Sequence, residues 1–444
     1  MTSVDNRSYS ERYGWYVVFV LCICGIVAYI DRQIINLLVE EIKVDLDVTD
    51  TQISLLQGFA FAVFYALVAI PLGRIADSGN RRWLITIGIL AWTAAAIACG
   101  LAQNYTQLFI ARMFVGVGEA VLTPAGFSLL ADLFKPKRLA RPVSVFTASS
   151  FFGAGIALVL GGVIINQLTA AGGIDLPIVG AVKVWQGAFI IGALPGIPVA
   201  IWFFLTVREP PRRTTEAIAA DSKVYRQGFA QAIRYVAANG RLFFAVFIGL
   251  SLIAAAQFAL GAWIPAFFMR VHEWTAGDIG SVQGLLFLFC GTLGVVSGGW
   301  LTDVLHNRGY HDANLRISAF AALLAIPFFA AVPAVASPTI AIVLLAPGMF
   351  LGTVPFGAGA AVIPTVSPPM FRAQLVALYL LVANIVGQAG GPWAVAFLTD
   401  SVFADDKAVG SSLMVVVPLL LATGAAIVSL GWRPLAEKLK GVSD

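Results

Sequence analysis

The sequence predicts an all-α membrane protein of twelve transmembrane helices, arranged as two pseudo-symmetric six-helix bundles with both termini in the cytoplasm. Three observations predict this fold: an apolar composition, an alternating distribution of basic residues, and a motif that occurs once in each half. Of the 444 residues, 59% are hydrophobic and 12% are charged, and the mean hydropathy is +0.87. Soluble domains contain about 25% charged residues, so this chain could not cover a water-exposed surface. The composition excludes a soluble enzyme, a nucleic-acid-binding protein and a disordered chain.

Twelve apolar runs are long enough to cross a bilayer as helices, which takes about 20 residues each. They lie near residues 15–38, 54–76, 83–102, 107–134, 142–168, 185–207, 242–268, 276–300, 315–336, 338–366, 373–399 and 411–432. The first run is too long for a secretory signal and lacks a small-residue cleavage site, so we expect it to remain as the first helix. All four cysteines lie inside apolar runs without metal-ligand spacing, and we interpret them as core residues.

The basic residues support this count because they alternate between the two sides of the membrane. With the N-terminus placed in the cytoplasm, 22 of the 28 Lys and Arg residues fall on the cytoplasmic side and four fall outside. The remaining two, Arg32 and Arg112, lie inside predicted helices. Such a bias is the positive-inside pattern. We expect a multi-pass integral membrane protein of the cell membrane, which is the inner membrane in a bacterium.

One long polar segment divides the chain into halves. The predicted domains are an N-terminal bundle over residues 1–207, a cytoplasmic linker over 208–241 and a C-terminal bundle over 242–444. Apolar residues between positions 225 and 236 recur at helical spacing, which predicts an amphipathic helix on the inner membrane surface.

A short motif, G-x-x-x-D followed by basic residues, comes after the second and the eighth apolar runs. Its residues are Gly73, Asp77, Arg81 and Arg82 in the first half and Gly299 and Asp303 in the second half. The two copies are 226 residues apart, which is close to half the chain. Two six-helix bundles in parallel duplication are a known transporter architecture.

The position of this motif predicts a cytoplasmic gate. A carboxylate at the end of one helix is stabilised by the N-terminus of a neighbouring helix, which carries about half a positive charge. We expect Asp77 to face the start of the eleventh helix near Arg372, and Asp303 to face the start of the fifth helix near Arg141. These contacts would form when the cytoplasmic side closes.

The segment from Gly73 to Arg82 resembles the loop 2–3 signature of the major facilitator superfamily, G-x-x-x-D-R-x-G-R-R. Ser78 replaces its first Arg and Asn80 its second Gly. The resemblance covers the whole chain and implies the major facilitator fold. Within the superfamily, residues 29–32 (Tyr-Ile-Asp-Arg) and 112–120 are similar to the spinster branch. That similarity implies an amphipathic lipid or lysolipid as the substrate.

Four ionisable residues lie well inside predicted helices: Asp31, Arg32, Arg112 and Glu119. Each costs about 2.5–3.5 kcal/mol at a helix centre, so these side chains must face a cavity or one another. Glu119 lies seven residues after Arg112, which puts both on one face of the fourth helix, about 10 Å apart in depth. Asp31 and Arg32 lie in the first helix at a depth similar to that of Arg112 in the fourth helix, so we expect one shared site.

The chemistry of these groups suggests their roles. Arginines stay charged when buried, so Arg32 and Arg112 can bind an anionic substrate group but cannot carry a proton. Asp31 and Glu119 can gain or lose a proton when their surroundings change, which is what proton coupling requires. No charged residue lies well inside the predicted helices of the second half, whose polar candidates for substrate binding are Gln257, Tyr379, Asn384 and Gln388. A cavity charged on one wall and apolar on the other suits an amphiphile.

We therefore predict a proton-coupled secondary transporter that works by alternating access. Its partners are an amphipathic small molecule, protons and membrane lipids. We expect a monomer with no cofactor, no metal and no nucleic-acid partner. A proton-coupled porter of small organic anions such as sugar acids is one alternative, and a non-transporting membrane sensor is another. The sequence contains neither a catalytic constellation nor a G-x-x-x-x-G-K-[ST] motif, which argues against an enzyme and against ATP as the energy source.

Overall fold

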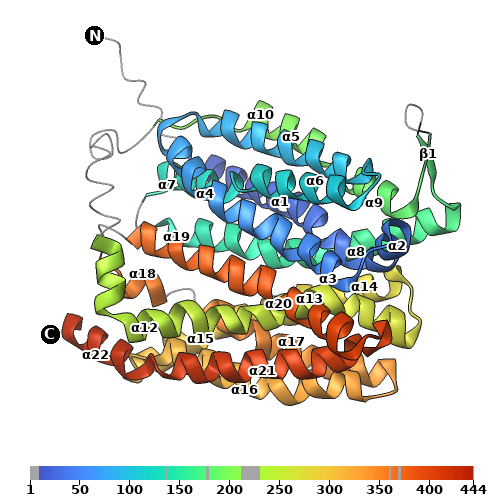
Figure 1. Cartoon of the computed structure of the whole chain (residues 1–444). Coiled ribbons are helices and arrows are strands. Elements are labelled where there is room, and N and C mark those ends of the chain that lie inside the picture. Colours follow the sequence, from blue (N-terminus) through green and yellow to red (C-terminus); the bar gives the residue numbers. More distant parts are fainter. Residues whose placement is uncertain are drawn as a thin grey trace, which may run out of the picture.

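The computed structural model describes residues 10–135, 138–176, 180–211, 231–359, 362–368 and 372–443. Within these residues, twelve helical segments are long and apolar enough to cross a membrane, and they coincide with the twelve predicted runs. We call them spans 1 to 12. The first span begins and the last helix ends at the same end of the bundle (Figure 1), which we call the termini end, and the other end is the opposite end.

Six spans form the first half. They consist of α1 (Glu11–Leu37); α3 (Asp50–Ser54), η1 (Leu55–Phe59) and α4 (Ala60–Ser78); α5 (Arg81–Gly100); α6 (Tyr105–Glu119) and α7 (Leu122–Leu133); α8 (Ala140–Ala171); and α9 (Val184–Ala193) with α10 (Gly196–Thr206). The short helix α2 (Val39–Leu46) lies in the loop between spans 1 and 2.

Six further spans form the second half. They consist of α12 (Gly240–Phe244), η3 (Ala245–Gly249) and α13 (Leu250–His272); α14 (Ala276–Leu286), η4 (Phe287–Gly291) and α15 (Thr292–Asn307); α16 (Ala313–Ala331), followed by η5 (Val332–Ala334); α17 (Pro338–Gly359) and α18 (Val362–Val366); α19 (Arg372–Val382), η7 (Ala383–Ala389), α20 (Gly390–Phe397) and η8 (Leu398–Phe403); and η9 (Asp406–Ala408), α21 (Val409–Ser429) and α22 (Trp432–Ser443).

Polar side chains set where several spans begin. Asn80 and Asn104 accept hydrogen bonds from main-chain N–H groups three residues later, at the starts of spans 3 and 4. Thr49 and Thr275 form reciprocal capping boxes with the third residue of their helices, at the starts of spans 2 and 8. These caps satisfy N–H groups that have no partner within the helix.

The two halves lie side by side (Figure 1) and meet along two pairs of spans, 5 with 8 and 2 with 11. Glycines bring spans 5 and 8 together: a Cβ on Gly155 would lie 2.6 Å from the carbonyl oxygen of Gly284, and a Cβ on Gly284 would lie 2.5 Å from that of Gly155. Small residues of this kind allow helix backbones to touch within a membrane.

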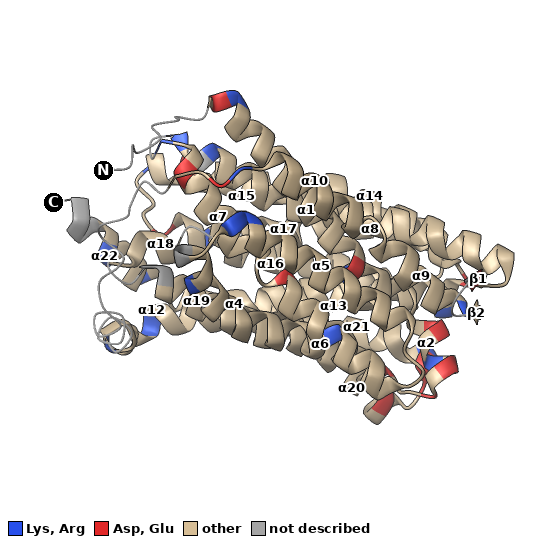
Figure 2. Ribbon diagram, turned by 90° about the horizontal axis from the view of Figure 1, so that it is seen from above, with Lys and Arg blue, Asp and Glu red and all other residues tan. Residues whose placement is uncertain are grey.

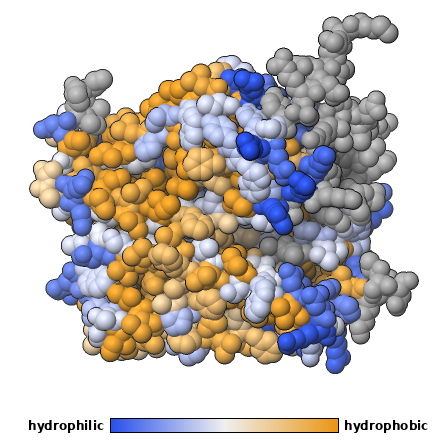
Figure 3. Space-filling model, turned by 180° about the vertical axis from the view of Figure 1, so that it is seen from behind, coloured by the Kyte–Doolittle hydropathy of each residue, from blue (hydrophilic) through white to orange (hydrophobic). Residues whose placement is uncertain are grey.

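The surface fits a membrane protein. Apolar side chains cover the middle of the visible face, and hydrophilic ones gather towards its ends (Figure 3). Most Lys and Arg residues lie at the termini end, whereas Asp and Glu gather around α2 and beyond α20 at the opposite end (Figure 2). This distribution agrees with the predicted placement of the termini in the cytoplasm.

The described residues also contain a short hairpin that we did not predict. Strands β1 (Ile174–Leu176) and β2 (Gly180–Val182) pair antiparallel between spans 5 and 6. The chain leaves α8 through Gly172 and Gly173, which both have positive φ angles that favour glycine. A search for long apolar runs passes over a hairpin of three-residue strands.

In the part of the chain that the structure describes, five π-helical turns were also not predicted. They interrupt span 2 (η1), span 7 (η3), span 8 (η4) and span 11 (η7 and η8). A π-helical turn widens the helix by one residue, and it occurs most often at functional sites.

Part of the predicted amphipathic linker helix is observed. Residues 231–238 are helical, and the rest of the predicted helix lies outside the described residues. Tyr235 donates a hydrogen bond of 2.6 Å to the carbonyl oxygen of Val366, and Lys438 donates one of 2.7 Å to Asn239. These contacts attach the end of the linker to the second half.

Candidate functional site

The four buried charges come together between spans 1, 2 and 4. Arg32 contacts Glu119 Oε2 with both Nε and Nη2 at 2.6 Å. Arg112 donates to the main-chain oxygens of Asp31, at 2.8 Å, and Leu56, at 3.3 Å. Asp31, Arg112 and Glu119 are each 1% exposed. The structure thus places all four predicted residues in one cluster.

The hydrogen bonding of the two acids is incomplete. Among the described residues, none donates a hydrogen bond to either carboxylate oxygen of Asp31 or to Oε1 of Glu119. Burying an ionised carboxylate without hydrogen-bond partners is costly. The cluster therefore contains carboxylate oxygens that are available to a proton.

Three aromatic rings surround Arg32. Its guanidinium carbon lies 4.9 Å from the ring centre of Tyr29, 4.3 Å from that of Phe61 and 5.2 Å from that of Tyr65. Cation–π contacts of this kind are worth up to about 2 kcal/mol when desolvated. We did not predict a role in the site for these three aromatic residues. Tyr29 could have been predicted because it lies three residues before Arg32 on the same helix face. No spacing in the sequence connects Phe61 and Tyr65 of span 2 with Arg32.

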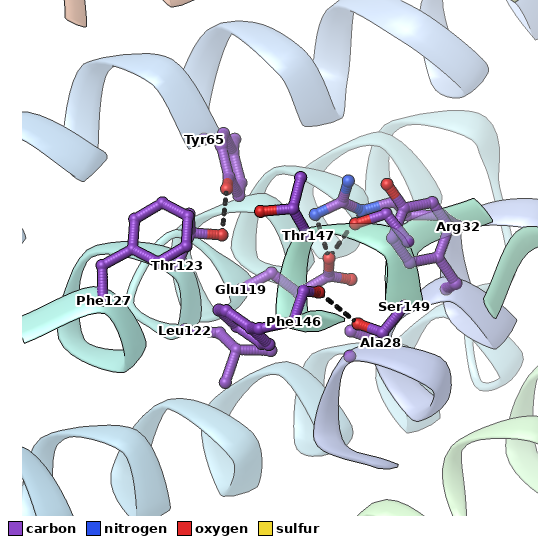
Figure 4. Close-up of a pocket in the computed structure, with 13 residues that line it drawn as sticks. Ala28, Arg32, Tyr65, Glu119, Leu122, Thr123, Phe127, Phe146, Thr147 and Ser149 are labelled. Carbon is purple, nitrogen blue, oxygen red and sulfur yellow. Dashed lines mark hydrogen bonds and ion pairs between the residues drawn. The ribbon is translucent and has the colours of Figure 1, made fainter. Parts of the chain in front are cut away.

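A cavity of about 180 Å³ adjoins this cluster. Its polar lining includes Arg32 and Glu119, together with hydroxyl groups from spans 2, 4 and 5. In Figure 4 the guanidinium of Arg32 points towards the Glu119 carboxylate, and the hydroxyls of Tyr65 and Thr123 face each other at 3.3 Å. Because pockets for drug-sized ligands measure about 300–1,000 Å³, this volume suits a polar head group and not a whole lipid.

The polar candidates of the second half do not line this cavity. Gln257 is 7% exposed and packs against Gly352, where an added Cβ would clash with its Nε2. Asn384 donates to the carbonyl oxygen one turn earlier in its own helix, at 2.7 Å. Tyr379 packs against an aromatic ring of span 7 at 5.9 Å, and the main chain of Gln388 contacts span 2. Their predicted role in substrate binding is therefore untested.

At the termini end, Arg81 and Arg82 bond within the first half and to the start of the linker. Arg81 is 1% exposed and forms ion pairs with Asp132 and Glu209. Arg82 donates from Nε to the carbonyl oxygen of Phe204 at 2.7 Å and lies over its ring. The side chains of Asp77 and Arg372, which we expect to face each other in the gate, lie outside the described part of the structure.

The remaining predicted gate residues, from both halves, make few contacts. Asp303 and Arg141 are both exposed, and the structure describes no ion pair between them. A Cβ on Gly73 would meet only Pro124, at an ordinary 3.8 Å, and one on Gly299 would meet nothing within 4 Å. The gate between Asp303 and Arg141 remains a prediction for a conformation in which the termini end is closed.

At the opposite end, a cluster of charges joins the two halves, and the sequence reading did not assign it a role. Arg270 of span 7 donates from Nη1 and Nη2 to the two carboxylate oxygens of Asp50, at 2.6 and 2.7 Å. It also donates to Glu40 at 2.7 Å. Asp50 is fully buried and starts span 2. One available signal was that Arg270 is among only four basic residues predicted outside, opposite an acidic loop.

Further contacts extend this opposite-end cluster, which comprises Glu40, Lys43, Asp50, Arg270, Asp400 and Asp406. Lys43 contacts Asp50 at 2.8 Å and Asp406 at 2.7 Å. Burial opposes the charge on Lys43, but its hydrogen bonds to Asp406 and Asp50 outweigh this effect and raise its pKa. Asp400 accepts a hydrogen bond of 2.6 Å from the N–H of Thr51, at the start of span 2.

Three carboxylates of the opposite-end cluster have the spacing of metal ligands. Oxygens of Asp50, Asp400 and Asp406 all lie within 4.8 Å of one another. Lys43 and Arg270 already bind Asp50, so the protein's own cations neutralise the most buried of the three. This arrangement favours a set of ion pairs that connects the halves over a metal centre.

Comparisons with known proteins agree with this architecture. A family model described as Major Facilitator Superfamily matches residues 21–392. The chain is 28% identical over 426 residues to an MFS-type efflux pump of Mycolicibacterium smegmatis, covering 95% of this chain and 94% of that protein. A solved bacterial homolog of the human lysosomal transporter Spinster, in an inward-facing and unoccupied conformation, superposes with a TM-score of 0.77 at 24% identity, covering 97% and 98% of the two chains.

Two further relatives have different names. Protein spinster of Drosophila melanogaster is 24% identical, covering 88% of this chain and 63% of that protein. A probable L-galactonate transporter of Escherichia coli is also 24% identical, covering 69% of this chain and 65% of that protein.

Proposed function

This chain belongs to the Major Facilitator Superfamily, and from that premise we propose that it is a proton-coupled transporter of an amphipathic lipid or lysolipid. The family and the similar structures are those of multi-pass membrane transporters and not of enzymes. The finer proposal concerns the substrate and the coupling ion, and it is carried by one observation: the Arg32–Glu119 pair at the wall of the first-half cavity.

Proton uptake by Glu119 would change what Arg32 can bind. The ionised carboxylate holds the guanidinium at 2.6 Å, and a neutral carboxyl would lose the charge-assisted part of this interaction. Arg32 keeps its charge throughout. Its guanidinium, held between three aromatic rings at the wall of the cavity, would then be free to bind an anionic group. Asp31, whose carboxylate oxygens have no hydrogen-bond donor among the described residues, would hold a second proton.

The shape of the site supports an amphiphile. The cavity of about 180 Å³ accommodates a charged head group. The second half contributes no charged side chain at this depth, so an acyl chain lying along it would bury apolar surface, at about 25 cal/mol per Å². Similarity to spinster proteins supports the same class of substrate, because the resemblance to that branch implies a lipid or lysolipid.

The opposite-end cluster supports alternating access. It holds the halves together at one end, and we propose that it separates when the termini end closes. With the termini in the cytoplasm, the present conformation would receive substrate from the cytoplasmic side.

A small organic anion such as a sugar acid is a second candidate substrate. The small volume of the cavity and the ability of Arg32 to bind a carboxylate favour it. Similarity to a probable L-galactonate transporter adds to this case.

Transport into proteoliposomes under an imposed pH gradient tests the proposal. We expect uptake of a labelled lysophospholipid to exceed that of a hexuronate, and to collapse when an ionophore removes the gradient. Uptake of the hexuronate alone would select the second candidate. Equal lysophospholipid uptake with and without the gradient would contradict proton coupling.

Three variants test the residues. Glu119→Gln and Asp31→Asn keep the shapes of the side chains but cannot ionise, so we expect each to reduce gradient-driven uptake at least tenfold. Asp312→Asn is the matched control, because Asp312 is also buried but pairs with Arg316 in the second half. Wild-type uptake by the double variant Asp31→Asn/Glu119→Gln would rule out these acids as the proton site.

A further inference from the structure

The contacts of Arg112 differ from those of Arg32. Arg112 is 1% exposed, yet its recorded hydrogen bonds go to two main-chain oxygens, those of Asp31 and Leu56. No ion pair with a carboxylate is recorded for it among the described residues, and it is absent from the lining of the cavity. Its position therefore does not fit its predicted role as a substrate ligand.

One of these oxygens belongs to a π-helical turn. Leu56 lies in η1, where the N–H of Ala60 bonds to the oxygen of Leu55, five residues back rather than four. Such a turn breaks the regular ladder of helix hydrogen bonds, and a side-chain donor inserted there stabilises it. Arg112 supplies a charged donor to this turn.

The same turn touches the other half of the protein. A Cβ on Gly58 would lie 2.5 Å from the carbonyl oxygen of Gln388 and 2.8 Å from Cα of Ala389. Both contacts are with η7, the π-helical turn of span 11. The backbone of span 2 therefore meets span 11 at the turn that Arg112 holds.

Span 2 is held at its start as well. Arg270 binds Asp50, and Asp400 accepts from the N–H of Thr51. The span thus links the buried charges, through η1, to the opposite-end cluster. We infer that Arg112 is a positioning residue that holds η1 of span 2 against η7 of span 11, and so keeps the opposite end closed.

A link to protonation rests on the proposed function. Arg112 already bonds the main-chain oxygen of Asp31, and it also interacts electrostatically with the carboxylate of the same residue, which is an alternative acceptor. The charged and titratable groups that interact with Asp31 are Glu119 and Arg112 of span 4, with Cys99 of span 3. When Asp31 loses its proton, its carboxylate would draw the guanidinium away from Leu56, and the turn would lose its donor.

Spin labels across the opposite end test the inference. Val44 of α2 and Val402 of η8 are 86% and 63% exposed and lie in different halves, so labelled cysteines there report the separation of the halves. In wild type we expect a short distance at pH 5 and a growing long-distance population at pH 8. In Arg112→Gln we expect the long distance to dominate at both values, with a pH response reduced at least fivefold.

Two companion variants guard against simple misfolding. Arg112→Lys retains a charged donor, so we expect it to restore part of the short-distance population at pH 5. Gly58→Ala leaves all charges in place but pushes span 2 away from Gln388, so we expect it to lengthen the distance while leaving the pH midpoint unchanged. Arg316→Gln is the control, since this cation bonds Asp312 within the second half.

The outcomes separate this inference from the proposed function. A wild-type distance distribution and pH response in folded Arg112→Gln would overturn the inference. If Arg112→Gln opens the opposite end while Asp31→Asn/Glu119→Gln keeps the wild-type pH response, the positioning role stands and the proposed proton site fails.

Discussion

The two ends of the molecule use their charges differently. At the opposite end, Arg270 binds Asp50 and Glu40 across 220 and 230 residues of sequence, which joins the second half to the first. At the termini end, Arg81 of the first half pairs with Asp132 of the same half and with Glu209 at the start of the linker, and the ion pair of Arg316 stays within the second half. The ion pairs of Arg270 at the opposite end join the two halves. The ion pairs of Arg81 and Arg316 at the termini end stabilise each half by itself.

This difference shows how a transporter with two bundles can be stable and still move. Pairs within a half need not break when the halves rock against each other, so they can be buried and permanent. In the alternating access that we propose, pairs between halves break and reform in each cycle, so their strength sets the balance between conformations. A ligand or proton shifts such a balance only by its differential affinity for the two states.

The largest expected effect is that of Arg270→Gln. It removes both hydrogen bonds to a fully buried Asp50 and leaves Lys43 as the nearest cation. Loss of one partner of a buried pair costs about 3–5 kcal/mol, and the remaining lysine reduces the cost to about 2 kcal/mol. We expect the closed population at the opposite end to fall more than tenfold, as measured by the Val44–Val402 distance.

The control for this variant is Lys183→Gln. Lys183 lies at the same end but pairs with Asp45 of its own half. We expect it to leave the distance distribution unchanged. An equal shift in the control would mean that any loss of charge opens this end, and that the pairs between the halves are not special.

A smaller effect on conformation, but a clear one on stability, is expected for Arg81→Gln. Arg81 is buried, and its removal leaves Asp132 and Glu209 without their shared cation. We expect the free energy of unfolding to fall by about 3 kcal/mol, seen as a lower Tm of the detergent-solubilised protein. A change in the Val44–Val402 distance comparable to that of Arg270→Gln would contradict the division between the two ends.

The smallest expected effect concerns Glu41, beside the opposite-end cluster. Burial raises the pKa of Glu41 to about 7 from an ordinary 4.5, with a further contribution from Glu40 and against the effect of a backbone hydrogen bond. The folded protein therefore favours the protonated acid. Its contribution to stability is fully present below pH 4.5, is lost as the pH rises towards 7, and stays lost above that.

Glu41→Gln should remove this dependence. We expect its Tm to match wild type at pH 5 and to exceed it by roughly 2 °C at pH 8. Thermal unfolding at the two pH values measures the difference. A lower Tm than wild type at pH 8 would mean that the ionised carboxylate is stabilised by a partner, as Asp50 is.

Much of the architecture could be predicted because it depends on local properties of the chain. The number of spans follows from apolar runs of about 20 residues, and the predicted placement of the termini follows from the basic loops. The shared site of Asp31, Arg32, Arg112 and Glu119 also followed, because the rise and periodicity of a helix fix depth and face.

The partners within that site could not be predicted in the same way. Four charges within about 10 Å of depth allow several pairings, and only packing decides that Arg32 pairs with Glu119 while Arg112 bonds two main-chain oxygens. The hydrogen bond to Leu56 depends on a π-helical turn, and no characteristic amino-acid pattern marks such a turn in the sequence.

The sequence by itself determined twelve spans, their expected orientation and the depth of the buried charges, because hydrophobicity and helix geometry act over one span at a time. Only the tertiary structure decided which charges pair, and that Arg270 and Asp50 join the two halves, because residues 220 positions apart meet only when both bundles are packed.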